Sequence, residues 1–170
     1  MKNKILIATA LILISITCLS CSFFKFNKLI GFADQDLQGE IRSYPYTFVA
    51  GYARTNYMDT DCYSIFLLPS SPNAGYAPWD ENAYDKLYPY LSFVLEKNSV
   101  PQMYNISTLG ADGIMLTGYS TYSDGVLFDD GQLEITSIDT VTNIISGRIW
   151  GTTNEETSTV SGNFQVVIKH

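Results

Sequence analysis

Short runs of apolar residues separated by polar turn residues fill most of the chain. Within several runs every second position is apolar: Leu133 and Ile135 alternate with Gln132 and Glu134, and residues 164–168 repeat the pattern. A period of two places one side of a strand on a core and the other side in water. The pattern therefore predicts a protein built from half-buried β-strands.

Nine such runs, each rich in β-branched or aromatic residues, are expected to be strands. They are residues 37–43, 46–54, 62–68, 90–97, 113–119, 125–128, 132–138, 144–151 and 160–169. Residues 78–87 could form a short helix, with Asp80 and Glu81 at its favourable N-terminal end. This content predicts an all-β fold, an antiparallel β-sandwich, with a closed antiparallel β-barrel as the alternative.

Two turns between these runs carry hairpin chemistry. Asp129, Asp130 and Gly131 separate two strands, and the glycine can supply the left-handed conformation of a tight hairpin. Residues 154–156 join the last two strands. We expect a hairpin at each place.

An apolar–x–Gly–x–apolar pattern occurs around Gly39, Gly147 and Gly162, at irregular spacing that indicates no structural repeat. Glycine inside a strand usually marks a bulge or the close approach of another backbone. The phrases LQGEIRSYPYTFVAGYAR, DGQLEITSIDTVTNIISGRIWG and STVSGNFQVVI together resemble small secreted or lipid-anchored bacterial β-proteins of uncharacterised function. The resemblance implies a fold and a location, and it implies no activity.

The N-terminus has the charge order of a secretory signal. MKNK carries two positive charges, and the following ILIATALILISITCLS carries none. The stretch Cys18-Leu19-Ser20-Cys21 resembles the lipobox of bacterial lipoproteins, in which the cysteine after the cleavage site carries a diacylglycerol. The resemblance implies that residues 1–20 are a signal peptide and that Cys21 is lipidated, with Cys18 as the alternative. Residues 5–24 as an uncleaved membrane anchor, and plain secretion, are the other interpretations.

The lipobox resemblance implies a location in the bacterial cell envelope, lipid-anchored outside the cytoplasm, at the outer membrane or cell surface. Residues 21–36 are then a tether and residues 37–170 one β-domain. The tether contains four phenylalanines that either lie in the lipid interface or pack on the domain. From residue 21 onward the chain has eight basic and seventeen acidic residues, a formal charge of −9, which argues against a nucleic-acid partner.

Cys62 is the remaining thiol if Cys21 carries lipid. It opens an apolar strand, so we expect a free and at least partly buried thiol. If Cys18 were lipidated instead, Cys21 and Cys62 could form a disulfide.

Few residues suit catalysis or metal binding. The single histidine, His170, and one spare cysteine supply neither a nucleophile system nor a zinc site. We therefore predict no catalytic residue, no metal and no cofactor, and a β-domain with a non-catalytic binding or structural role. The alternative is a carboxylate-based hydrolase acting on glycans, since Asp59 with Asp61, Asp80 with Glu81, and Asp129 with Asp130 form acidic pairs.

The longest interruption between strands, residues 71–90, is the best candidate for a ligand site. It carries aromatic side chains beside carboxylates, and long loops in compact domains are often functional. The predicted ligand-binding residues are Tyr76, Trp79, Tyr84 and Tyr88, for a glycan or a protein; the other interpretation is that these rings only cover one end of the sandwich. Trp79 is expected to be at least half exposed because it lies between Pro78 and acidic residues.

Overall fold

The computed structural model describes residues 31–73, 87–108, 113–122, 124–154 and 157–169. These residues form eleven strands and no helix, which confirms the all-β prediction. The strands are β1 (Gln38–Ile41), β2 (Tyr44–Thr47), β3 (Ala50–Thr55), β4 (Cys62–Leu68), β5 (Tyr90–Glu96), β6 (Gln102–Asn105), β7 (Thr117–Thr121), β8 (Asp124–Leu127), β9 (Asp130–Asp139), β10 (Ile144–Thr152) and β11 (Thr159–Ile168). The described residues contain no helix long and apolar enough to cross a bilayer.

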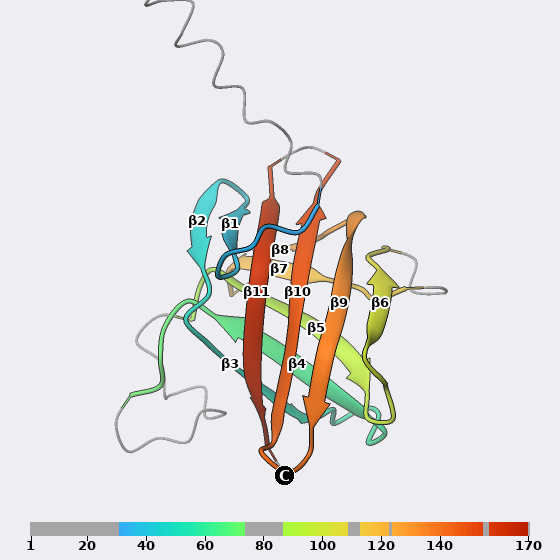
Figure 1. Cartoon of the computed structure of the whole chain (residues 1–170). Coiled ribbons are helices and arrows are strands. Elements are labelled where there is room, and N and C mark those ends of the chain that lie inside the picture. The colour runs from blue at the N-terminus through green and yellow to red at the C-terminus, as the bar shows by residue number, and fades with distance from the viewer. Residues whose placement is uncertain (1–30, 74–86, 109–112, 123, 155–156, 170) are drawn as a thin grey trace, which may run out of the picture.

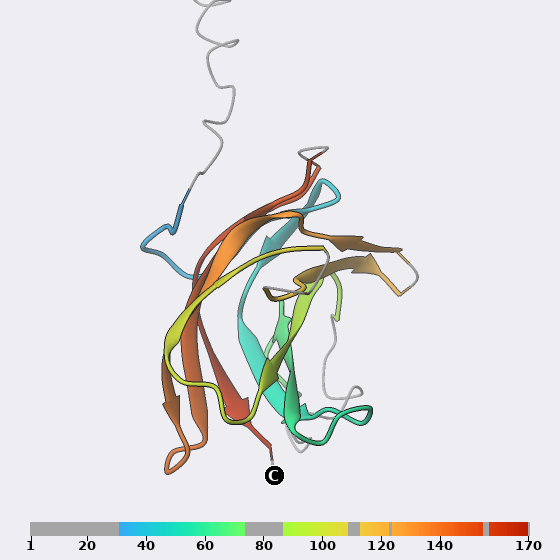
Figure 2. The same ribbon diagram turned by 90° about the vertical axis from the view of Figure 1, so that its right-hand side faces the viewer.

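All eleven strands belong to one hydrogen-bonded sheet. Its order is β6-β9-β10-β11-β3-β4-β5-β7-β8, and the β1–β2 hairpin joins β11 at the side. The sheet curls into a half-barrel, with β9, β10 and β11 forming one wall and β3, β4 and β5 crossing behind them (Figures 1 and 2).

The sheet is mixed, so the prediction of purely antiparallel pairing is wrong at one place. Strands β11 and β3 pair in parallel, Val167 with Tyr52 and Ile168 with Ala53. The chain path explains the direction: β1 runs antiparallel to β11 and β2 antiparallel to β1. Strand β2 therefore runs in the same direction as β11, and β3 continues in that direction. The chain changes partner between the two strands: the Phe48 amide donates to Leu37, and the Val49 amide donates to Leu68.

The alternating pattern of the sequence matches the burial of the strands. Leu133 and Ile135 are buried inside the curl, and the intervening Glu134 is on the outer side, where it forms an ion pair with Arg148. In β11, Phe164, Val166 and Ile168 are buried while the residues between them are exposed. The inward side chains of the two walls form the main core, which Tyr46 joins by donating its hydroxyl to the Leu67 carbonyl (3.3 Å).

The three patterned glycines lie where backbones approach closely, as predicted. A Cβ on Gly39 would lie 1.9 Å from the Thr159 carbonyl oxygen, and one on Gly162 would lie 2.6 Å from the Leu37 Cα. Both have positive φ, +155° and +142°. At Gly147 the pairing of β10 with β9 shifts register, and a Cβ there would lie 2.4 Å from the Glu134 carbonyl oxygen.

One predicted hairpin is confirmed and the other is wrong. Strands β10 and β11 pair directly, and the Thr153 amide donates to Ser158 at the turn. Strands β8 and β9 do not pair with each other, because β8 pairs with β7, and β9 pairs with β6 and β10. Gly131 is needed for another reason: its φ is +149°, and a Cβ would lie 2.3 Å from the Trp150 carbonyl oxygen.

Strand β6 was not expected, because its four residues are mostly exposed and polar and show no apolar side. It nonetheless pairs with β9, from Gln102 opposite Ile135 to Asn105 opposite Gln132. The segment 78–87 predicted as a helix lies outside the described residues except for Leu87, which is in no helix.

The described end of the tether packs across the outer side of β10 and β11. The Ser161 hydroxyl donates to the Gly31 carbonyl (3.0 Å) and accepts from the Ala33 amide (2.8 Å). The Arg148 guanidinium lies 4.4 Å from the centre of the Phe32 ring. Phe32 packs on the domain but lies in no strand, and the other three tether phenylalanines lie outside the described residues.

Candidate functional site

Most of the predicted ligand residues lie outside the described part of the chain. These are Tyr76, Trp79 and Tyr84, and the same holds for Cys21, the predicted lipidation site. Tyr88 is described: its ring is half-buried and lies 5.3 Å from that of Tyr90. The expected exposure of Trp79 stays a prediction.

Tyr88 belongs to a larger row of rings on the outer side of the half-barrel. Tyr52 stacks on Phe66 with ring centres 5.0 Å apart, Phe66 lies 6.3 Å from Tyr90, and Tyr90 stacks on Tyr119 at 4.7 Å. We call Tyr52, Phe66, Tyr88, Tyr90 and Tyr119 the aromatic strip. It crosses four neighbouring strands, β3, β4, β5 and β7.

The strand register produces the strip. Tyr52 is directly opposite Phe66, and Tyr90 is directly opposite Tyr119. In β5 the inward residues are Leu91, Phe93 and Leu95, so Tyr90 points outward. Cross-strand aromatic pairs of this kind stabilise a sheet. The sequence prediction names Tyr88 as ligand-binding, and Tyr90 ends the same 71–90 stretch. The other three rings come from strands whose neighbours in the sheet a single sequence does not reveal.

The strip is neutral and rich in hydroxyl groups. Burial, followed by the neighbouring Tyr119, Tyr88 and Tyr52, raises the pKa of Tyr90 well above its ordinary value, while Arg54 acts in the opposite direction. Tyr90 therefore keeps its proton at neutral pH. The Arg54 guanidinium lies 5.1 Å from the Phe66 ring centre, so a single cation lies over the described rings of the strip.

A hollow of about 460 Å³ adjoins the strip, between β5 and the chain leading into β7. Its lining combines hydroxyl groups, aromatic rings and aliphatic side chains, and it includes no carboxylate and no amine. The lining residues are Ser64, Phe66, Tyr90, Ser92, Phe93, Val94, Gly113, Ile114, Met115, Thr117 and Tyr119.

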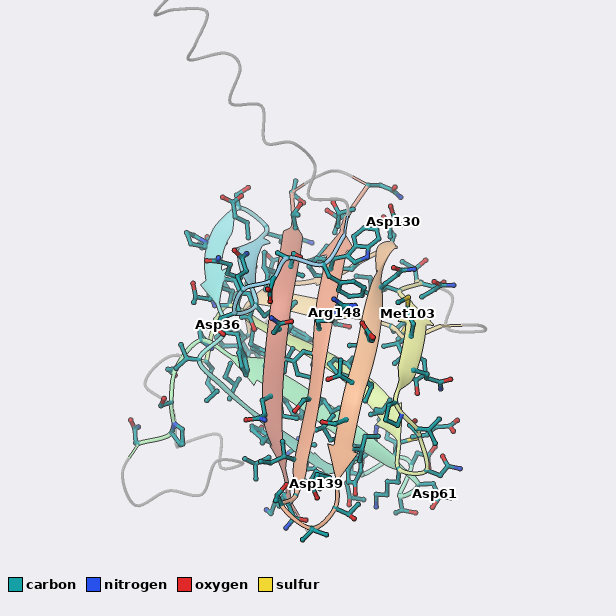
Figure 3. The ribbon with its side chains drawn as sticks, viewed as in Figure 1. Asp36, Asp61, Met103, Asp130, Asp139 and Arg148 are labelled. Carbon is teal, nitrogen blue, oxygen red and sulfur yellow. The ribbon has the colours of Figure 1, made fainter. Side chains whose placement is uncertain are left out.

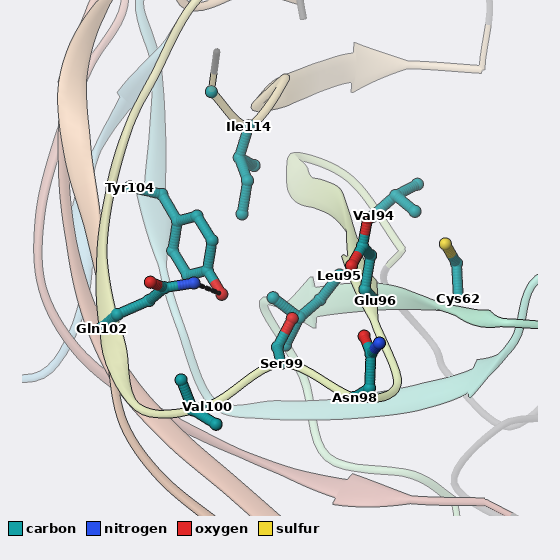
Figure 4. Close-up of a pocket in the computed structure, with 11 residues that line it drawn as sticks. Cys62, Val94, Leu95, Glu96, Asn98, Ser99, Val100, Gln102, Tyr104 and Ile114 are labelled. Carbon is teal, nitrogen blue, oxygen red and sulfur yellow. Dashed lines mark hydrogen bonds between the residues drawn. The ribbon is translucent and has the colours of Figure 1, made fainter. Parts of the chain in front are cut away.

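A second hollow, of about 590 Å³, lies between β5 and β6 (Figure 4). Tyr104 and Gln102 project into it from β6, and the Gln102 amide donates to the Tyr104 hydroxyl at 2.7 Å. Glu96 is the single carboxylate of its lining. The two hollows share Val94, Gly113 and Ile114.

The described acidic pairs lie at opposite ends of the half-barrel. Asp61 lies near the start of β4 and Asp130 at the start of β9 (Figure 3). Each pair includes a carboxylate that fixes a loop: Asp59 accepts from the Asp61 amide (3.0 Å), and Asp129 accepts from the Asn154 amide (3.0 Å). The third pair, Asp80 with Glu81, lies outside the described residues. Across the described ranges, no group of three histidine, cysteine, aspartate or glutamate residues could hold a metal ion.

Cys62 is a buried free thiol, as predicted. Its sulfur donates to the Asp59 carboxylate at 3.4 Å. Burial, and then the hydrogen bond and negative charge of Asp59, raise the pKa of the thiol. A thiol kept protonated in this way is a weak nucleophile.

Comparisons of this chain with protein-family models, with curated proteins and with solved structures find no match.

Proposed function

We propose that this chain is a lipid-anchored protein of the bacterial cell envelope, tethered through Cys21, whose β-domain binds a ligand and does not catalyse a reaction. The ligand is a neutral, hydroxyl-rich molecule, a glycan, held at the aromatic strip and the hollow beside it. The observation that carries this proposal is the row of rings next to a hollow lined by hydroxyl groups and no carboxylate.

The strip can contact a sugar through the ring surfaces and hydroxyl groups that stacking leaves open. Stacking occupies one face of each of the Tyr90 and Tyr119 rings, so their hydroxyl groups and remaining surfaces can contact a ligand. Ser64, Ser92 and Thr117 add hydroxyl groups within the same hollow. Apolar ring edges with a few fixed polar groups are the usual composition of a small-molecule site.

The finer architecture belongs to the same proposal. We treat the domain as an incomplete barrel rather than as two stacked sheets. One continuous hydrogen-bonded path from β6 to β8 supports this choice, as does the bridge between Ile106 and Ile114, which connects the chain after β6 to the chain before β7.

Glycan binding can be tested with the detergent-solubilised full-length protein on an array of bacterial polysaccharides and peptidoglycan fragments. Tyr90→Phe and Tyr119→Phe keep the rings and remove the hydroxyl groups, so each should weaken binding about tenfold. Tyr122→Phe is the matched control, because Tyr122 is 88% exposed and outside the strip. Equal binding by all variants would contradict the proposed site. Release of reducing sugar from an array glycan would instead support the hydrolase alternative.

The anchor has its own test. Cells fed with labelled palmitate should label the wild-type protein, and Cys21→Ser should abolish the labelling. Cys18→Ser is the control and should keep it. Labelling retained in Cys21→Ser and lost in Cys18→Ser would move the anchor to Cys18.

A further inference from the structure

The wall of the half-barrel has an opening between β5 and β6. Strand β7 pairs with β5 at Tyr90, Leu91 and Ser92, and among the described residues no ladder continues along Phe93 to Glu96 on that side. The chain before β7 instead crosses to the other side of the opening. There the Ile114 amide donates to the Asn105 carbonyl (2.9 Å) and the Ile114 carbonyl accepts from Ser107 (3.1 Å).

A close backbone crossing holds this arrangement. A Cβ on Gly113 would lie 2.3 Å from the Asn105 carbonyl oxygen, so only glycine lets the two segments approach. The crossing closes one end of the opening. Below it, the edges of β5 and β6 face each other across the hollow of about 590 Å³ (Figure 4).

Main-chain groups of β5 point into the opening. The Lys97 amide donates to the Asp61 carbonyl on the β4 side. In an antiparallel ladder alternate residues bond to opposite sides, so Leu95 and Phe93 also bond to β4, and the residues between them are directed away from it. The Val94 amide and carbonyl and the Glu96 amide are therefore directed into the opening, while the Glu96 carbonyl accepts from Ser99.

The same reasoning applies to β6. The Ile106 amide donates to the Gly131 carbonyl on the β9 side, so Tyr104 and Gln102 bond to β9 as well. Met103 then has its amide and carbonyl directed into the opening. Two sheet edges whose donors and acceptors have no partner within the described part of the chain thus line one hollow, which is the arrangement that strand addition uses.

The opening carries exposed apolar side chains, and acidic side chains lie at one end of it. Val94, Val100 and Met115 are 46%, 61% and 47% exposed, although all three are apolar. At the end near the start of β4, Asp59, Asp61 and Glu96 lie close enough to act together on the Cys62 thiol. Among the residues that line the two hollows, none carries a positive charge.

We propose that this opening binds an extended peptide segment of a partner protein, which pairs as an added strand with the main chain of Val94 and Glu96. An apolar side chain of the peptide packs on Val94 and Met115, and a basic side chain lies at the Glu96 end. The proposal depends on sheet edges and not on the aromatic strip, although Val94 and Met115 also line the hollow beside the strip.

A displayed library of linear twelve-residue peptides, selected on the detergent-solubilised full-length protein, provides the probe. Selected peptides should alternate apolar residues and carry lysine or arginine. Val94→Pro removes only the donor directed into the opening, because that amide does not bond to β4, so it should weaken binding about tenfold or more. Val94→Ala keeps the amide and is the matched control. Glu96→Lys should weaken basic peptides while leaving the main chain unchanged.

Two further measurements keep the test decisive if Val94→Pro fails to fold. Methyl groups can be placed on every second backbone nitrogen of a selected peptide, at either the odd or the even positions. Only one of these two methylation patterns should abolish binding. Bound peptide should slow hydrogen exchange at the Val94 and Glu96 amides and leave Leu95 unchanged. The proposal would be overturned if the selection enriched no peptide, or if neither methylation pattern changed the binding of a selected peptide. Self-association of the protein that Val94→Pro abolishes would also overturn it, because this result would assign the opening to a second copy of the chain.

Discussion

At the residue scale, single positions carry constraints that a sequence pattern only hints at. Gly39 and Gly162 are needed because β1 and the residues just before it approach β11 at backbone contact distance, and the apolar–x–Gly–x–apolar pattern did predict a close approach there. The same pattern could not say which backbone approaches. Gly131 looked like a hairpin glycine from its Asp-Asp-Gly context, whereas a contact with β10, distant in sequence, decides its role.

Gly162→Ala is expected to destabilise the protein by about 2 kcal/mol or more, through an unfavourable φ and a Cβ pressed against the Leu37 backbone. Gly31→Ala is the matched control. Gly31 also has a positive φ, +127°, but a Cβ there meets nothing within 4 Å, so about 1 kcal/mol is expected. Urea denaturation measures both free energies of unfolding. Equal losses of unfolding free energy would show that backbone strain, and not the contact with Leu37, makes glycine necessary at position 162.

Asp139 gives a prediction about pH. Its carboxylate accepts from the Val141 and Thr142 amides in the turn after β9, and hydrogen bonds from Thr142 and then Val141 lower its pKa. A carboxyl whose folded pKa lies below its unfolded value of about 3.9 stabilises the fold above that value, and loses this effect as the pH falls through the folded pKa. Asp139→Ala should therefore lower Tm at pH 6, by an amount that shrinks as the pH falls below about 4.

Thr142→Val tests the cause of this pH dependence. It removes one donor to Asp139 and keeps both main-chain donors, so the loss of Tm should have the same sign and be smaller. Thermal melts between pH 2 and pH 7 measure both variants. A Tm difference for Asp139→Ala that does not change with pH would contradict the role given to the carboxylate.

At the element scale, strands were predictable and their neighbours were not. The nine predicted runs correspond to ten of the eleven strands, because the run 46–54 divides into β2 and β3 at the point where the chain changes partner. Alternation of side chains is a local property, so it can be read from one sequence. Register and sheet order depend on contacts between distant segments. For this reason Tyr88 was the one residue of the aromatic strip predicted to bind a ligand, and the parallel pairing of β11 with β3 was missed.

The strip makes a prediction about coupling between strands. Tyr90 and Tyr119 stack across β5 and β7, so replacing both by alanine should cost about 1 kcal/mol less than the sum of the single replacements. Tyr90 with Tyr122 is the control pair, because Tyr122 is 88% exposed and contacts no ring of the strip among the described aromatic pairs. Its coupling should be within about 0.3 kcal/mol of zero. A coupling near zero for both pairs would mean that the rings are merely neighbours.

At the scale of the whole molecule, the domain begins closer to the proposed anchor than the sequence indicated. Residues 31–36 were expected to be part of a tether, and they pack on β10 and β11 through Ser161, Asn163 and Arg148. If Cys21 carries the lipid, nine residues separate it from Gly31, and the chain between them can span at most about 35 Å. Under the proposed anchoring, the contacts of residues 31–36 would keep the half-barrel within about that distance of the membrane.

Ser161 is the residue on which this attachment can be tested. Its buried hydroxyl joins the Gly31 carbonyl and the Ala33 amide, so Ser161→Ala should release residues 31–34 while leaving the pairing of β1 with β11 in place. We expect faster hydrogen exchange at the Ala33 amide, faster proteolysis before Leu37, and a loss of about 1 kcal/mol in the free energy of unfolding. Ser146→Ala is the matched control on β10, since the Ser146 hydroxyl contacts only the Gln165 side chain among the described hydrogen bonds. Unchanged exchange at Ala33 in Ser161→Ala would show that Phe32 and Arg148 hold the tether without it, and Phe32→Ala in the same background would then be expected to release it.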